Sequence, residues 1–97
     1  MISDLQSCPV RNPAVIDEQV GEERVLVFPE RGKVAVLNPV ASRIWSLCSG
    51  SCSVLEMVEI VNRDYEIDLE QGRADVLEFL AELASRDAIY FVNPPAG

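Results

Sequence analysis

The chain has 97 residues, of which 48% are hydrophobic and 25% are charged, and this balance is typical of one globular domain with a single core. The net charge of −8, with eight basic residues against sixteen acidic ones, argues against binding to the phosphate backbone of a nucleic acid. The chain contains no histidine, which removes the commonest general base and the commonest zinc ligand.

The start of the chain, MISDLQSCPV, lacks the basic region and the apolar stretch of a signal peptide. No apolar run approaches the ~20 residues that a membrane-spanning helix needs. We therefore expect a cytoplasmic protein without a membrane partner, in which the three cysteines stay reduced.

The N-terminal part is predicted to contain an arm and a small sheet. Residues 1–13 hold two prolines and no usable periodicity, so we expect a flexible or extended arm. β-Branched residues bounded by glycine and proline predict strands over 14–20, 24–28 and 33–38, with a hairpin turn over 29–32. Strands this short form a stable sheet only when they pack against helices.

A first helix is predicted to begin at Pro39. Asn38 is a good N-cap, and proline suits the first helical position because its missing N–H is not needed there. Apolar side chains then recur at helical spacing, with Cys48 among them, and Gly50 is expected to end the helix.

Two more helices are expected. Ser53 and Glu56 form the S-x-x-E pattern of a capping box, which opens a second helix to about Tyr65. Asp68, with a glutamine three residues later, gives a similar signal for a third helix to about Arg86. The inner face of this third helix is predicted to contain Leu69, Val76, Leu80 and Leu83.

The last apolar run, Ala88–Val92, is short and aromatic and is predicted to be a strand, followed by a disordered tail over 93–97. The order of these elements predicts an α+β fold with a single domain over 14–92. The tight glycine-containing turn between the first two helices is typical of a helix-turn-helix. We therefore expect a winged helix-turn-helix, in which a small antiparallel three-stranded sheet packs on a three-helix bundle beside a short C-terminal strand.

No residue pattern predicts catalysis or a metal site. Cys48 and Cys52 have only the distant Cys8 as a further thiolate and no histidine, whereas a structural zinc site needs four ligands. We therefore interpret these two cysteines as core and turn residues. The carboxylates fall on outward helix positions, and the serines of SGSCS have no base to activate them. We expect no enzymatic activity, no cofactor and no metal.

The strand predicted over 33–38 carries the main functional signal. It contains no proline or inward charge to block pairing, and a sheet this small leaves an edge exposed unless something covers it. An extended peptide can add to such an edge through main-chain hydrogen bonds, with a neighbouring helix supplying side-chain contacts. The same sequence is equally consistent with a strand whose edge is already paired or is covered by the N-terminal arm, and such an edge would not bind a peptide.

Two other functions stay open from the residues alone. A winged-helix regulator would bind DNA through the third helix, but that helix holds six acidic residues and two arginines, and the remaining basic residues are scattered. A structural subunit would use the same edge to dimerise, or would dock on an enzyme. The chain is accordingly expected to be a monomer or a weak homodimer.

The span VAVLNPVASRIWSLCSG, residues 34–50, resembles the LN-x-x-A-x-x-I-W-x-L-x-x-G pattern of the PqqD-like family. Members of this family are winged-helix domains known as RiPP precursor peptide recognition elements. The later span from Val54 to Ile89 is similar to the second and third helices of the family, so the resemblance begins at about Arg24 and ends at Ile89. The Asp-Gly that commonly follows the first helix is Ser-Gly here, and SRDAI stands where a glycine often precedes the final apolar residues.

The resemblance implies a non-catalytic adaptor that binds the leader of a ribosomally made precursor peptide and delivers it to a modifying enzyme, often a radical-SAM protein. It implies that the leader adds to the third strand and lies against the third helix, with Lys33 and Arg73 available to acidic leader side chains. For Leu80 a core position is the stronger interpretation. The resemblance does not distinguish PQQ biosynthesis from the maturation of another modified peptide. The implied peptide-binding residues are Lys33, Val34, Ala35, Val36, Leu37, Arg73, Leu77, Leu80 and Ala81.

Overall fold

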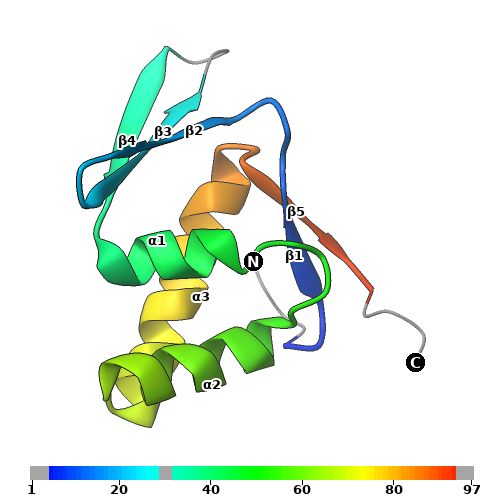
Figure 1. Ribbon diagram of the computed structural model, residues 1–97. Helices are drawn as coiled ribbons and strands as arrows, with labels where there is room; N and C mark the ends of the chain where they lie inside the picture. Colours follow the sequence, from blue (N-terminus) through cyan, green and yellow to red (C-terminus); the bar gives the residue numbers. More distant parts are fainter. Residues whose placement is uncertain (1–4, 29–31, 94–97) are drawn as a thin grey trace.

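The computed structural model describes residues 5–28 and 32–93 of the chain. The predicted α+β class is confirmed, because a three-stranded antiparallel sheet packs beside three helices and a short strand closes the fold (Figure 1). The elements in chain order are β1 (Cys8–Arg11), β2 (Ile16–Val20), β3 (Glu23–Phe28), β4 (Lys33–Leu37), α1 (Pro39–Ser46), α2 (Val54–Tyr65), α3 (Leu69–Ser85) and β5 (Ile89–Val92).

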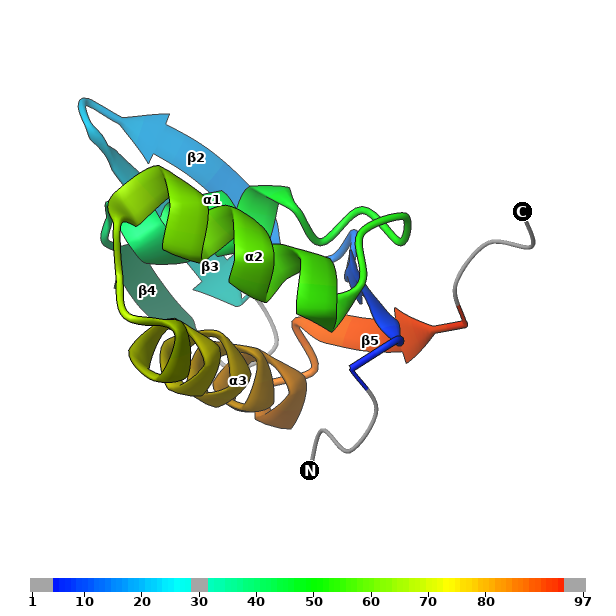
Figure 2. The same cartoon turned by 90° about the horizontal axis from the view of Figure 1, so that it is seen from below.

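The three-stranded sheet has the order β2-β3-β4, so β3 is central and the other two strands are edges. Strand β2 begins two residues later than predicted, because the side chain and the carbonyl of Asn12 accept hydrogen bonds from the N–H groups of Ala14 and Val15 in a turn. The hairpin turn predicted over 29–32 falls largely outside the described residues, which resume at Gly32. The helices lie on one side of this sheet and appear in front of it in Figure 2.

Strands β1 and β5 form a second, two-stranded antiparallel sheet, in which Cys8 is opposite Val92. The arm predicted over 1–13 is therefore extended, but Cys8–Arg11 is a strand of the packed fold and not a separate arm. Arg11 also donates hydrogen bonds to the carbonyls of Trp45 and Ser46 at the end of α1, at 3.1 and 3.0 Å. The described part of the arm thus pairs with β5 and leaves the edge of β4 uncovered. Residues 1–4 of the arm and 94–97 of the tail lie outside the described residues.

Helix α1 begins as predicted and ends earlier than predicted. Asn38 Oδ1 accepts a hydrogen bond from the N–H of Ala41 at 2.8 Å, and proline occupies the first turn. The helix ends at Ser46, so Cys48 lies after it, buried in the turn, and not on its apolar face. Gly50, with φ of +88°, belongs to this turn, where an added Cβ would lie 3.0 Å from a methyl group of Val10 in β1. Close approach of β1 therefore selects glycine at this position.

The predicted capping box of α2 is confirmed, because Ser53 Oγ accepts from the N–H of Glu56 and Glu56 Oε1 accepts from the N–H of Ser53. Asp68 is the N-cap residue of α3 as predicted, but its side chain makes no hydrogen bond to the helix. Leu69 is 64% exposed and does not belong to the inner face, which contains Val76, Leu80 and Leu83 as predicted.

The core joins the three-stranded sheet to α1. Trp45 is 1% exposed and packs with Leu26 of β3, and its indole N–H donates to Asp17 Oδ2 of β2 at 2.6 Å. The same carboxylate accepts two hydrogen bonds from Arg24, whose Nε donates to Ser42 of α1. This network fixes the β2–β3 hairpin against the first helix.

The three cysteines are free thiols, and Cys8 and Cys48 are buried. Burial raises the pKa of the Cys48 thiol to about 12, and its Sγ lies 3.3 Å from the carbonyl of Ile44. Burial, with a further contribution from the Glu56 carboxylate, also raises the pKa of the half-buried Cys52. Raised pKa values keep both thiols protonated, which opposes nucleophilic and redox chemistry because the thiolate is the reactive form.

We expect Cys48 to resist alkylation in the folded protein. At about pH 8, near the ordinary pKa of a thiol, iodoacetamide should modify Cys52 before Cys48, and all three thiols should react in urea. Mass spectrometry of proteolytic fragments over a time course measures the order. Rapid native labelling of Cys48 would contradict its assignment as an inert core residue.

We also expect Asp17→Ala to destabilise the fold by about 1–3 kcal/mol, because it leaves the buried indole N–H of Trp45 without its acceptor. Urea unfolding followed by tryptophan fluorescence measures the change. Glu18→Ala is the matched control, since Glu18 lies one residue further along β2 on the opposite face of the sheet, and it should change stability by less than about 0.5 kcal/mol. Equal effects of the two substitutions would rule out the hydrogen bond as the cause.

Candidate functional site

Strand β4 has a free edge. It pairs with β3 alone among the described residues, with Ala35 opposite Leu26 in the centre of the register. Every second residue of an edge strand directs its N–H and C=O groups away from the sheet, where a further strand can pair with them. The edge predicted from the sequence is therefore present and faces α3.

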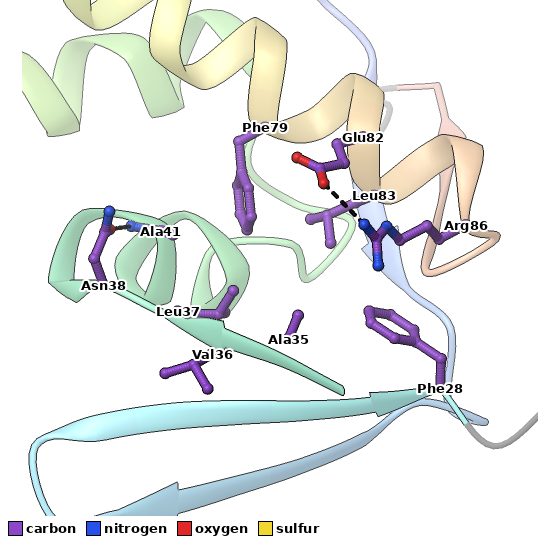
Figure 3. Close-up of a pocket in the computed structure, with 10 residues that line it drawn as sticks. All are labelled: Phe28, Ala35, Val36, Leu37, Asn38, Ala41, Phe79, Glu82, Leu83 and Arg86. Atoms are coloured by element: carbon purple, nitrogen blue, oxygen red, sulfur yellow. Dashed lines mark hydrogen bonds and ion pairs between the residues drawn. The ribbon is translucent and has the colours of Figure 1, made fainter. Parts of the chain in front are cut away.

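A groove of 230 Å³ lies between β4 and α3 (Figure 3). A second hollow, of 310 Å³, shares Asn38, Ala41 and Phe79 with it and extends it along the start of α1 to Asp75. The two hollows therefore form one groove that follows β4 into α1. The residues that line the first hollow are Phe28, Ala35, Val36, Leu37, Asn38, Ala41, Phe79, Glu82, Leu83 and Arg86.

The groove has an apolar middle and charged ends. Phe79 projects from α3 towards β4 in Figure 3 and, with Leu83, gives the groove its apolar wall. At one end Arg86 pairs with Glu82 at 3.0 Å, and its guanidinium carbon lies 5.6 Å from the centre of the Phe28 ring. At the other end the carboxylate of Asp75 accepts a hydrogen bond from Gln71 at 2.8 Å. An extended peptide of mixed apolar and charged side chains matches this arrangement.

The five predicted residues of β4 lie together at the free edge. Leu37 is 5% exposed, and it shares the inner face of the sheet with Ala35, so both line the groove. Val34 and Val36 are 60% and 59% exposed and lie on the other face, and the side chain of Val36 points away from α3 in Figure 3. Lys33 is opposite Phe28 in the register, at the end of the groove that holds Arg86.

The structure does not bring the four predicted residues of α3 to the groove. Leu80 is fully buried in the core, as the stronger interpretation had it. The other three predicted residues lie away from the groove. With 3.6 residues per turn, each is at least about 120° around the helix from Phe79, which lines the groove. They lie on the far side of the buried stripe that faces the core. These three residues are Arg73, Leu77 and Ala81.

The groove instead uses a stripe of α3 that the sequence interpretation missed. Asp75, Phe79, Glu82 and Arg86 recur at steps of four, three and four residues, which places them on one side of the helix. The available signal was Phe79, a large aromatic residue that does not fit the predicted inner face. An aromatic side chain beside a core stripe marks the direction in which the apolar surface continues.

No metal site or membrane-spanning element emerges from the described ranges. Within residues 5–28 and 32–93, no three His, Cys, Asp or Glu side chains are grouped so that they could hold a metal ion. No helix in these ranges combines the length and apolar character required to cross a bilayer. The groove between β4 and α3 is therefore the candidate binding site.

Comparison with known proteins gives two matches. The family model described as "Coenzyme PQQ synthesis protein D (PqqD)" matches residues 23–89. Among solved structures, the chain is similar to TbiB1 in complex with the TbiA(beta) leader peptide, with 29% sequence identity and a TM-score of 0.73. That match covers 82% of this chain and 93% of the TbiB1 chain. A search of curated proteins gives no match.

Proposed function

We propose that this chain, which belongs to the PqqD family, is a non-catalytic adaptor that binds the leader segment of a ribosomally synthesised precursor peptide. The observation that carries the proposal is the free edge of β4 beside an apolar groove on α3. The similarity to TbiB1, whose structure contains a leader peptide, supports it. The adaptor presents the bound precursor to a modifying enzyme, which we propose to be a radical-SAM protein.

The leader binds as an additional strand on β4. Its main chain pairs with the free N–H and C=O groups of Val34–Leu37, which supplies affinity with little dependence on sequence. Alternate leader side chains then enter the groove and contact Phe79 and Leu83 of α3, which supplies specificity. Burial of these apolar contacts contributes about 25 cal/mol for each Å² removed from water.

The charges at the two ends of the groove favour one arrangement of the leader. Lys33 and Arg86 lie at the end near Phe28, and Asp75 lies at the other end. An acidic leader side chain therefore binds at the first end and a basic one at the second. Because these groups are partly exposed, their main effects are on register and on the rate of association.

Titration with the leader peptides encoded beside this gene tests the proposal. We expect amide NMR shifts to concentrate on β4 and on the stripe of α3 that contains Phe79. Phe79→Ala should weaken binding by about tenfold, since it removes the largest apolar contact in the groove.

Leu77→Ala is the matched control, because Leu77 is also a partly buried apolar residue of α3 that packs against the core but lies outside the groove. It should leave leader affinity within about twofold of the unmodified protein. A larger loss with Leu77→Ala than with Phe79→Ala would move the site to the face of Arg73, Leu77 and Ala81. Absence of shifts on β4 with every such peptide would contradict leader binding.

A further inference from the structure

None of the three helices in the described part of the chain covers the outer face of the three-stranded sheet. The strand register places eight residues on this face, because residues directly opposite one another in neighbouring strands point to the same side. Ile16, Val27 and Val34 form one row across the sheet, and Glu18, Val25 and Val36 form the next. Val20 and Glu23, which are opposite each other, extend the face towards the turn between β2 and β3.

This face is apolar and open to solvent. The exposed fractions of Ile16, Val20, Val34 and Val36 are 48%, 59%, 60% and 59%. An antiparallel sheet that is buried on one face only carries alternating apolar and polar residues, with the polar ones outward. Here the inner face packs on α1 through Leu26 and Leu37 and also carries Asp17 and Arg24, whereas the outer face is apolar apart from Glu18 and Glu23. Strands with apolar residues on both faces are typical of sheets covered on both sides.

Among the described residues, the charged groups that the register places on the outer face are both acidic. Glu18 lies within the face, and Glu23, opposite Val20, lies at its end. The nearby basic residues Arg24 and Lys33 belong to the inner face, since they are opposite Leu37 and Phe28. A second copy of this chain, with its own net charge of −8, would place like charges against these carboxylates. A complementary surface is apolar in the middle and bordered by lysine or arginine.

We propose that the outer face of the β2-β3-β4 sheet is the docking surface for the modifying enzyme, through an apolar patch on that enzyme with a basic border. The inference rests on the proposed adaptor function. The leader groove and the outer face lie on opposite sides of β4, so the leader and the enzyme can be bound at the same time. Docking through this face holds the enzyme at the sheet whose free edge displays the leader.

The test measures affinity for the purified modifying enzyme encoded beside this gene, by biolayer interferometry. The double substitution Ile16→Thr and Val20→Thr keeps the strand propensity of β2 and removes apolar area from the strand most distant from the leader edge. It should weaken enzyme binding by at least about tenfold. Glu18→Lys should weaken binding and reduce the dependence of the association rate on salt.

The matched control is Tyr90→Thr, which removes a residue that is 52% exposed on β5, in the other sheet, and it should leave the affinity unchanged. Leader affinity, measured in parallel, should stay within about twofold for every variant, which separates this proposal from leader binding itself. Unaltered enzyme affinity in the β2 variants, or no binding of the enzyme at all, would overturn the proposal. Loss of self-association by the same variants in sedimentation would also overturn it and assign the face to a second copy.

Discussion

The structure depends on the packing of one face of a very small sheet against one helix. A sheet of three short strands is unstable in isolation, and here its inner face is covered by α1 through Leu26 and Trp45. The hydrogen bond from Trp45 to Asp17 and the ion pair of Asp17 with Arg24 fix the strands relative to the helix. Because β4 continues directly into α1, fixing the sheet also fixes the free edge beside α3.

Helix α3 carries two adjacent stripes of side chains, one that packs in the core and one that lines the groove. Val76, Leu80 and Leu83 fill the core, and Leu83 also reaches the groove. The helix approaches α2 closely at Gly72, where an added Cβ would overlap Asn62. Among the described residues, neither the nitrogen nor the oxygen of the buried Asn62 side-chain amide has a hydrogen-bond partner. Gly72 is about two turns before Phe79 on nearly the same side of α3, so close packing at Gly72 helps to fix the helix that carries the groove wall.

Local signals predicted most of the fold, and long-range contacts account for what they missed. The N-cap at Asn38 and the capping box of α2 are contained within a few residues, so the sequence was sufficient for them. Strand β1 forms because it pairs with β5 near the opposite end of the chain. A local sequence pattern cannot predict such a long-range pairing. The free edge of β4 was predicted only with the family resemblance, because its composition fits a paired or covered edge equally well. The stripe of α3 that faces this edge was not, because helical periodicity identifies the core stripe without showing on which side of it the sheet lies.

The pairing of β1 with β5 has a consequence for the order of folding. It joins Arg11 to Ile89, so it closes a loop that contains nearly the whole domain and has the highest contact order in the fold. The entropy of closing a long loop must be offset by contacts that form at the same time, whereas the hairpins and helices between these strands form from near neighbours. Every residue that lines the groove, from Phe28 to Arg86, lies inside that loop. The contacts that build the groove close shorter loops than the β1–β5 pair does, so we expect the β1–β5 pair to form late in folding.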